Sequence, residues 1–383
     1  MPRTATETFI IFQHAWGTGH LTRASAIADA FSSDSHVTMF AGGRPIKGYS
    51  APSGVDFVQL PAIGRSIANE LPVPADSEYS LAEIERQRSD MLVAHYRRLK
   101  PRVIITEYFP FAPRRFGQTT LDALLTAIEK EQHRPILVCS LRANPIVRPD
   151  IDVDPASINA QLRKLFSCVL HHADPQFFPL TAFGSYMQMA LSGVSFWQTG
   201  FVRRPVAKAA HDRPPTGILL TVGAGSRTGA KFLKRWIRAA KAGSPDLSPI
   251  HAVCGPLMNP DDRKSVHAEA APNVTVHDWV SNMDELILSS RAVVCLGGYN
   301  TLIESLSLNK PVLAFPVKAF GDQVFQVSAL RAQGMLLMGE ESQSEQEITA
   351  LMNQLPNFRA QHPIDCNGAE RSVEIVSQLL GAQ

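Results

Sequence analysis

A glycine-rich loop ending in histidine lies near the start of the chain. It contains Gly17-Thr18-Gly19-His20 and stands between an apolar run and a helical pattern. Glycines let the backbone approach a ligand closely, and the amino end of a helix attracts negative charge. An imidazole at this place can take a proton from a hydroxyl group at neutral pH. We therefore take His20 as a candidate catalytic base and Gly17, Thr18 and Gly19 as binding residues; the alternative is an ordinary tight turn with His20 as a cap.

A second glycine-rich loop, 221–229, also stands between an apolar run and a helical pattern. It contains Gly223, Gly225, Ser226 and Arg227. Main-chain amides, a serine hydroxyl and a guanidinium group together suit a diphosphate. The alternative is a glycine-rich turn that binds no ligand.

Neither loop is a common nucleotide-binding motif. Thr22 stands where the third glycine of the dinucleotide fingerprint would be. The loop at 221–229 lacks the Gly-Lys-Ser/Thr ending of a Walker loop, so an ATPase is not favoured.

A third loop offers the most specific pattern, a double glycine at the start of a helix followed one turn later by a carboxylate. The glycine amides suit a phosphate, and Glu304 is placed to accept two hydrogen bonds from a ribose diol. The candidate binding residues in this segment are Gly297, Gly298, Tyr299, Asn300, Thr301 and Glu304.

Asp322 and Gln323, on the next loop, are suited to sugar hydroxyls. A purely structural alternative exists for both segments. Thr301 and Glu304 have the spacing of a capping box, and Asp322 is a plausible helix N-cap.

Short apolar runs alternate with helical patterns along the whole chain, which predicts parallel sheets with crossover helices. In the first half we expect strands at 9–14, 37–41, 57–60, 102–107 and 136–141 and helices at 21–31, 81–99, 118–131 and 156–171. The second half predicts strands at 218–222, 251–254, 274–277, 292–296 and 312–315, with helices beginning near Gly229, Met283, Asn300 and Gln323.

The segment 202–217 is rich in proline and lacks periodicity, which indicates an interdomain linker. We therefore predict an α/β protein of two Rossmann-like doubly wound domains that face each other across a cleft. Their expected bounds are 1–205 and 216–365. The final segment, 366–383, has a helical pattern.

Length and composition exclude several classes of protein. With 383 residues and roughly 150 per domain, two large domains are expected. The hydrophobic fraction of 45% against 19% charged residues indicates a folded globular protein. The formal net charge of +2 gives no global field of the kind that nucleic-acid binders show, so no nucleic-acid partner is expected.

The five cysteines lie far apart and form no Cys-x-x-Cys pair, so neither a zinc site nor a disulfide framework is expected. No apolar stretch reaches the roughly 18 residues of a membrane span. Asp152-Val153-Asp154 resembles a metal-binding Asp-x-Asp pair, but Pro155 follows it, which favours a loop and an N-cap. We expect a cytoplasmic protein, and a basic helix face between Lys231 and Lys241 offers peripheral contact with the inner face of the cell membrane.

At these motifs the sequence resembles the GT-B glycosyltransferases, in particular the family of the N-acetylglucosaminyl transferase that completes lipid II. Gly17-Thr18-Gly19-His20 is similar to that family's amino-terminal loop. The segment 297–304 is similar to its donor-nucleotide signature, and Asp322-Gln323 to its pair that holds the donor sugar. The segment 106–111 and Asp174-Pro175 are typical of a less characterised group of predicted bacterial glycosyltransferases.

The resemblance implies a hexosyltransferase of polysaccharide or glycoconjugate biosynthesis. Its substrates would be a nucleotide sugar, expected to be a UDP-sugar, and a glycan, lipid-linked or small-molecule acceptor. By this resemblance the domain 1–205 binds the acceptor, the domain 216–365 binds the nucleotide sugar, and the helix in 366–383 packs back on the first domain. The resemblance also places Gly223 to Arg227 near the diphosphate and the backbone of Val280 beside the base. It implies direct displacement with inversion, His20 as the base and no metal ion or other cofactor.

Glu107 ends a predicted strand and is a second catalytic candidate, either orienting the acceptor or assisting His20. Its alternative is a solvent-facing carboxylate paired with Arg114 or Arg115. Two other functions remain open. A nucleotide-sugar hydrolase or epimerase would share the Gly-x-Gly-His-x-x-Arg pattern of His20 and Arg23, and a non-catalytic nucleotide-sugar sensor would bind without turnover.

Overall fold

The structure is a computed structural model of the 383-residue chain, and its contacts divide the chain into two units. Unit 1 comprises residues 1–204 and 366–383, and unit 2 comprises residues 205–365. The structure describes residues 6–13, 18–66, 71–75, 78–111, 118–143, 154–206, 214–225, 228–280 and 282–382.

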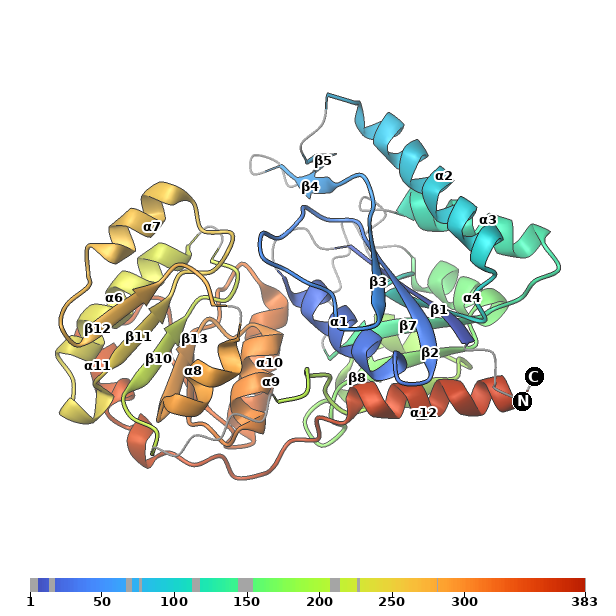
Figure 1. The fold of residues 1–383 in the computed structure, drawn as a ribbon. Helices are drawn as coiled ribbons and strands as arrows, with labels where there is room; N and C mark the ends of the chain where they lie inside the picture. Colours follow the sequence, from blue (N-terminus) through green and yellow to red (C-terminus); the bar gives the residue numbers. More distant parts are fainter. Residues whose placement is uncertain are drawn as a thin grey trace. The chain divides into compact units, whose positions relative to one another are not determined.

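Unit 1 is built on a seven-stranded parallel sheet in the order β3-β2-β1-β6-β7-β8-β9 (Figure 1). Its inner strands are buried along nearly their whole length, as parallel strands covered on both faces must be. The strands are β1 (Thr6–Phe12), β2 (Ser35–Ala41), β3 (Val55–Gln59), β6 (Val103–Glu107), β7 (Ile136–Arg142), β8 (Cys168–His172) and β9 (Phe196–Gln198).

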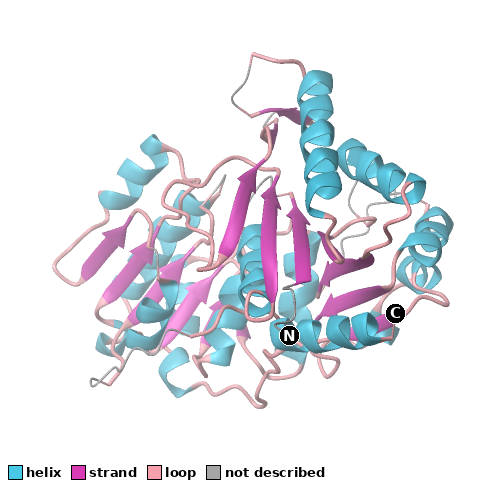
Figure 2. Ribbon diagram, turned by 45° about the vertical axis from the view of Figure 1, so that its right-hand side comes forward, coloured by secondary structure: helices cyan, strands magenta, loops and turns pink. Residues whose placement is uncertain are grey.

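Helices lie on either side of the strands (Figure 2). Those of unit 1 are α1 (Gly19–Phe31), α2 (Leu81–Leu99), α3 (Gln118–Lys130), α4 (Pro155–Leu165), α5 (Ser185–Ala190) and α12 (Gly368–Gly381), with a 3-10 turn at Leu180–Ala182. A small antiparallel pair, β4 (Ile63–Arg65) and β5 (Pro72–Pro74), lies outside the main sheet.

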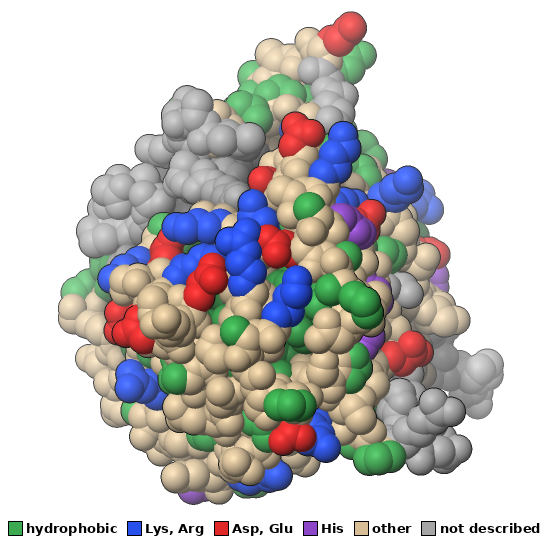
Figure 3. Space-filling model, turned by 90° about the vertical axis from the view of Figure 1, so that its left-hand side faces the viewer, with side chains coloured by type: hydrophobic (Ala, Val, Ile, Leu, Met, Phe, Trp, Pro, Cys, Tyr) green, Lys and Arg blue, Asp and Glu red, His purple; other side chains and the backbone are tan. Residues whose placement is uncertain are grey.

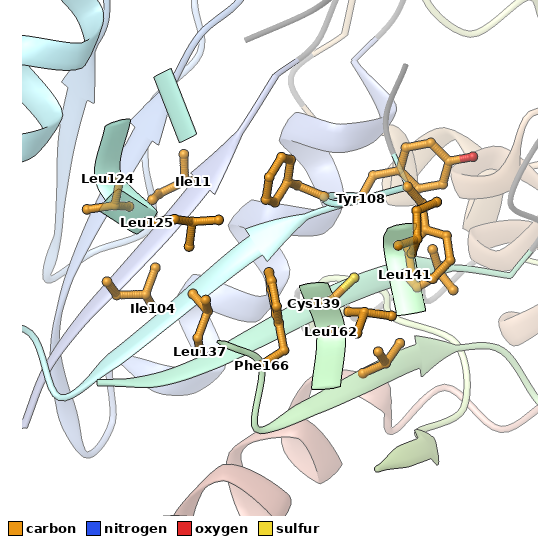
Figure 4. Packing of buried hydrophobic residues seen from close by; sticks show 14 of the residues in the cluster. Ile11, Ile104, Tyr108, Leu124, Leu125, Leu137, Cys139, Leu141, Leu162 and Phe166 are labelled. Carbon is orange, nitrogen blue, oxygen red and sulfur yellow. The ribbon is translucent and has the colours of Figure 1, made fainter. Parts of the chain in front are cut away.

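Two buried clusters hold the two faces of this sheet. On one face Ile104, Leu137 and Cys139 pack against Leu124 of α3 and Leu162 of α4 (Figure 4). On the other face the strands pack against α1 and α12, which lie side by side (Figure 1). The carboxyl-terminal helix α12 therefore belongs to the core of unit 1.

The predicted helix at 81–99 is confirmed as α2, and its start has a local cause. Ser80 is the N-cap, and its side chain accepts a hydrogen bond from the backbone N–H of Glu83 at 3.2 Å. Asp154 likewise caps α4 by accepting from the N–H of Ser157, with Pro155 at the first helical position. The N-cap expected for Asp154 is thus confirmed, and Asp152 and Val153 lie outside the described residues.

The predicted helix at 156–171 is wrong in its second half. Helix α4 ends at Leu165, Phe166 turns to extended backbone, and residues 168–172 form strand β8. The apolar run there continues the helical pattern by chance, but it lies beside β7 in the sheet, where pairing decides the conformation. The short strand β9 was not predicted.

Unit 2 has a six-stranded parallel sheet in the order β12-β11-β10-β13-β14-β15. Its strands are β10 (Ile218–Thr221), β11 (Ile250–Val253), β12 (Val274–His277), β13 (Ala292–Cys295), β14 (Val312–Ala314) and β15 (Leu337–Met338). Its helices are α6 (Gly229–Lys241), α7 (Pro260–His267), α8 (Met283–Ser289), α9 (Tyr299–Ser307), α10 (Gly321–Ala332) and α11 (Glu345–Met352), with 3-10 turns at Pro245–Leu247 and Leu355–Asn357.

The predicted α/β class is therefore confirmed, with one parallel sheet in each unit. Four of the five cysteines are buried, and all five are free thiols in this structure. Within the part of the chain that the structure describes, no helix is long and apolar enough to cross a membrane.

Candidate functional site

His20 and Glu107 lie at the point where the strand order of the first sheet reverses. Strand β1 pairs with β2 on one side and with β6 on the other. His20 is the second residue of α1, which follows β1, and Glu107 is the last residue of β6. In open α/β sheets ligands bind beyond the carboxyl ends of the strands at this switch point.

The two side chains are in direct contact. Nδ1 of His20 lies 2.9 Å from Oε1 of Glu107, and the side chain of His20 remains 26% exposed. Because an unprotonated Nδ1 would set two lone pairs against each other at this distance, Nδ1 carries a proton and donates it to the carboxylate. In the neutral form of this ring the other nitrogen, Nε2, is then the proton acceptor.

Arg23, one turn after His20 on α1, holds the same carboxylate. Its Nη2 donates to Oε1 of Glu107 and lies 3.3 Å from Nδ1 of His20. The side chains of Arg23 and Glu107 are each 2% exposed, so this is a buried ion pair. Such a pair keeps Glu107 ionised, and therefore able to accept the proton on Nδ1 of His20.

The structure contradicts the solvent-facing position considered for Glu107 and the capping role considered for His20. Glu107 is buried and engaged, and does not face solvent; Arg114 and Arg115, its proposed partners, lie outside the described residues. His20 does not cap α1, since the N-cap position is Thr18 and Gly19 is the first helical residue. Gly17 lies outside the described residues.

Three further polar side chains lie behind Glu107. Oγ of Ser140 is 2.6 Å from Oε2 of Glu107 and 2.9 Å from Nε2 of His172. Nδ1 of His172 is in turn 2.8 Å from Oγ1 of Thr199. All of these groups are buried.

Burial sets the charge state of the two adjacent histidines of β8. It lowers the pKa of His171 from 6.5 to about 4, although the bond from the ring to the carbonyl of Ala143 opposes the shift. It lowers the pKa of His172 well below 6.5, helped by the positive charge of Arg23 and by His171. Both rings are therefore neutral at physiological pH.

Ser140, His172 and Thr199 were not predicted as site residues. A usable signal existed for the first two, because each is a polar residue at or near the end of a buried strand, as Glu107 is. Glu107 and Ser140 are also register partners on neighbouring strands. Strand order, which brings the three side chains together, cannot be derived from spacing along the chain.

In unit 2 the switch point lies between β10 and β13, and two predicted binding loops begin there. The loop after β10 contains Gly223 and Gly225, both with positive φ angles. A side chain on Gly225 would collide with the carbonyl oxygen of Cys254, so this loop lies tightly against the end of β11. Ser226 and Arg227 lie outside the described residues.

The loop after β13 leads into α9. Gly297 has φ +80° and Gly298 is the N-cap of the helix. A side chain on Gly297 would meet Cγ2 of Val327 at 2.5 Å, whereas no atom lies within 4 Å of the position on Gly298. The backbone at Gly298 is therefore open to a ligand at the amino end of α9.

The residues after Gly298 lie on α9. Tyr299, Asn300 and Thr301 form its first turn and are each partly exposed, and Glu304 lies in the second turn and is 9% exposed. Because Gly298 and not Thr301 is the N-cap, the capping box considered for Thr301 and Glu304 does not form.

Asp322 and Gln323 lie in the first turn of α10. Oε1 of Gln323 accepts a hydrogen bond from the backbone N–H of Val317 at 3.2 Å, which ties the loop after β14 to the helix. Phe320, not Asp322, is the N-cap, so the capping role considered for Asp322 is wrong. Val280 is partly exposed and follows β12, which is the edge strand of the sheet opposite β15.

The basic face of α6 is largely neutralised by its own unit. Lys231 pairs with Glu341, and Arg238 pairs with Glu269 at 2.6 Å. Arg235 donates to backbone carbonyls of the loop before α11. On the face of the molecule where α6, α7 and α11 lie, Lys and Arg side chains accordingly alternate with Asp and Glu (Figure 3). Across the described ranges no group of three or more His, Cys, Asp and Glu side chains is placed to hold a metal ion.

Comparison with known proteins finds glycosyltransferases. Residues 218–371 match the glycosyltransferase family 28 C-terminal domain. A stretch of 82 residues is 30% identical to an uncharacterized glycosyltransferase of Methanosarcina mazei and covers 21% of this chain and 21% of that protein. The chain thus carries a glycosyltransferase domain, and its match spans only about a fifth of this curated relative.

Solved structures match nearly the whole chain. The calicheamicin glycosyltransferase CalG4 has a TM-score of 0.58 at 13% identity and covers 99% of this chain and 95% of its own. Acinetobacter baumannii MurG has a TM-score of 0.57 at 15% identity, with 97% and 99% covered. For TcCGT1, solved in complex with UDP, the TM-score is 0.63 at 13% identity, with 99% and 100% covered. The fold is GT-B. The predicted fold class is thereby confirmed.

Proposed function

We propose that this protein is a glycosyltransferase that moves a sugar from a nucleoside-diphosphate sugar, expected to be a UDP-sugar, to an acceptor hydroxyl. The observation that carries the proposal is the contact of 2.9 Å between His20 and Glu107 at the switch point of the first sheet. That contact makes Nε2 of His20 a base on a GT-B fold. The family 28 domain and the likeness to TcCGT1, whose structure contains UDP, support the donor class.

The proposed reaction is a single displacement. Nε2 of His20 takes the proton of the acceptor hydroxyl while the oxygen attacks the anomeric carbon. The bond from that carbon to the diphosphate breaks, and its electron pair leaves with the diphosphate. Attack opposite the leaving group inverts the anomeric configuration. Glu107 acts through His20, because its contact stabilises the imidazolium that forms.

The proposed donor site lies in unit 2. The amides at Gly298 and at the amino end of α9, the loop of Gly223 to Arg227 and the positive charge of Arg227 would stabilise the diphosphate without a metal ion. Glu304 would accept from the ribose diol, Asp322 and Gln323 would bind the sugar, and the backbone at Val280 would lie beside the base.

The acceptor is proposed by class only, as a glycan, a lipid-linked sugar or a small molecule with a free hydroxyl group. Membrane contact is proposed only for a lipid-linked acceptor. The basic face of α6 gives it little support, because Lys231 and Arg238 are already paired with acidic side chains.

The experiment is calorimetric titration of the protein with uridine, thymidine, guanosine and cytidine diphosphates and their sugars, repeated on Glu304→Ala. We expect one base to be preferred and the variant to bind it at least tenfold more weakly. Glu374→Ala, which removes an exposed carboxylate from α12, is the matched control and should bind as the parent does. Equal binding by Glu304→Ala, or no binding by the parent, would overturn the donor site.

Transfer is distinguished from hydrolysis by following the sugar of the preferred donor over a panel of acceptors. We expect release of the diphosphate to depend on the acceptor and to be lost in His20→Ala, with binding of the donor retained. Release at the same rate without any acceptor would instead identify a hydrolase, and binding without release by the parent would identify a sensor.

A further inference from the structure

A line of three buried side chains extends from Glu107 away from His20. Ser140 on β7, His172 on β8 and Thr199 just after β9 come from three successive strands of the sheet. Each is at most 1% exposed. Buried polar groups are costly unless every one of them is hydrogen-bonded, so the direction of each bond in this line is constrained.

The bond between Ser140 and Glu107 determines the direction of the whole line. At 2.6 Å it has the length of an O–H···O⁻ bond, and the carboxylate can only accept. Ser140 has a single proton, which it therefore donates to Oε2 of Glu107. Its contact of 2.9 Å with Nε2 of His172 must then be one in which Ser140 accepts.

It follows that Nε2 of the His172 ring carries the proton. Nδ1 of that neutral ring then accepts from the hydroxyl of Thr199 at 2.8 Å. The opposite direction would have Thr199 accept from Nδ1 of His172. The hydroxyl group of Thr199 would then donate to the carbonyl oxygen of Gly200, which lies 3.0 Å away. In that case Nδ1 of His172 would carry the proton, and Ser140 would have to donate its only proton to Nε2. The oxygens of Ser140 and Glu107 would then face each other at 2.6 Å with no proton between them.

We propose that Ser140, His172 and Thr199 form a one-way hydrogen-bond relay that positions Glu107 and thereby selects the Nδ1–H tautomer of His20. Every bond of this relay donates toward the carboxylate. With Oε2 held by Ser140, Oε1 faces Arg23 and Nδ1 of His20. The three are positioning residues, since each acts through Glu107.

The environment of His172 supports the neutral ring that this relay needs. Arg23 and His171 are the charged or titratable groups that lower its pKa, in addition to burial. The backbone carbonyl of Thr199 accepts from Nη1 of Arg371 at 2.5 Å, so the far end of the relay is tied to α12. The relay is thus anchored at both ends by arginine residues of unit 1.

The first test does not depend on activity. Two-bond ¹H–¹⁵N spectra of protein labelled in its histidines report the tautomer of each ring, with His20→Gln and His172→Gln assigning the two signals. We expect His172 as the neutral Nε2–H form and His20 as the Nδ1–H form at pH 7.5, and His172 unchanged down to pH 5. A His172 ring protonated on Nδ1, or one that titrates between pH 7.5 and pH 5, would overturn the proposal.

The second test breaks the relay at its two hydroxyl groups. In Ser140→Ala and Thr199→Val we expect the His20 signal to become a mixture of tautomers, and Thr199→Ser to restore the Nδ1–H form. Ser372→Ala is the matched control, because Ser372 is equally buried in unit 1 but donates only to the carbonyl of Gly368 on its own helix. An unchanged His20 tautomer in folded Thr199→Val would contradict the relay.

The kinetic part of the test rests on the proposed function. In the transfer assay we expect kcat of Ser140→Ala and Thr199→Val to fall at least tenfold while KM for the donor changes less than twofold. Thr199→Ser should recover most of the rate. A parent protein with the expected tautomers but no transfer would refute the proposed function and leave the relay standing; unaltered kcat in both folded variants of an active parent would refute the positioning role.

Discussion

Glu107 and Ser140 are register partners on the neighbouring strands β6 and β7, and their side chains meet at 2.6 Å. Glu107 also contacts the ring of His20, which is 26% exposed. The pair therefore connects a partly exposed side chain to the buried interior of the sheet. The buried carboxylate of Glu107, the guanidinium group of Arg23 and the hydrogen-bond donors around them must all be paired at once. Substitution of any one of these groups therefore leaves another without one of its partners.

Removing the charge of Glu107 should affect stability and activity at once. Glu107→Gln leaves the Arg23 guanidinium buried beside a neutral amide, and we expect a loss of about 3 kcal/mol in the free energy of unfolding. Transfer should fall by about 100-fold or more, since the imidazolium of His20 loses its counter-charge. Urea unfolding and the transfer assay measure the two effects.

Glu129→Gln is the control for that change. Glu129 pairs with Lys164 at the surface of the same unit, and such a pair contributes at most about 1 kcal/mol. Similar losses of stability in Glu107→Gln and Glu129→Gln would contradict the buried ion pair.

The pKa of His171 predicts a loss of stability in mild acid. The ring has a pKa of about 4 in the folded protein against 6.5 in the unfolded chain. As the pH falls from 6.5 to 4 the unfolded chain binds a proton that the folded protein does not, so folding loses about 3 kcal/mol, and nothing is lost above that range. His172 contributes in the same direction.

Urea unfolding of the parent and of His171→Phe between pH 7 and pH 4 measures this contribution. The His171 ring packs between Phe183 and Phe196, so an aromatic replacement suits the site. We expect the variant to lose less stability on acidification than the parent. Identical slopes would show that His171 does not carry the effect.

Gly42 should not tolerate a side chain. A Cβ there would collide with Oε1 of Gln13 and with Nη2 of Arg88. Arg88 is buried, which lowers the pKa of its guanidinium to about 10, and it donates to the carbonyls of Gly42 and Pro61 and to Gln13. We expect Gly42→Ala to cost about 1–3 kcal/mol in urea unfolding.

Gly184→Ala serves as the comparison, because no atom lies within 4 Å of the added carbon. It should cost much less than Gly42→Ala. If both variants unfolded at the parent's midpoint, the close packing of Gly42 against Arg88 would be wrong.

The two glycines before α9 are expected to have different roles, Gly297 in folding and Gly298 in binding. Gly297→Ala introduces a side chain at φ +80° and against Val327, so we expect a loss of at least about 1 kcal/mol in stability. Gly298→Ala meets no atom within 4 Å and has ordinary φ, so the protein should unfold as the parent does.

Calorimetry then tests whether the diphosphate binds at the open backbone of Gly298. We expect Gly298→Ala to weaken binding of the preferred nucleotide diphosphate at least tenfold, because the added methyl group stands where the phosphate approaches. Parental affinity in a stable Gly298→Ala variant would move the diphosphate site away from α9.

The local pattern of the sequence was sufficient for much of this description. Apolar runs and helical periods predicted the α/β class, the glycine-rich loop singled out His20, and the end of a predicted strand singled out Glu107. Such features depend on residues close together in the chain, where periodicity and capping act. Helix 81–99 shows this best, because Ser80 caps its start and Lys100, in the left-handed conformation, ends it.

Only the tertiary structure decided what Glu107 is bonded to. Arg23, Ser140 and His172 come from segments up to 149 positions apart, and they meet because β6, β7 and β8 are neighbours and α1 follows β1. The same strand pairing makes residues 168–172 a strand, although their local pattern predicts a helix. Contacts between distant segments depend on strand order and shared burial, which the spacing of residues along the chain does not encode.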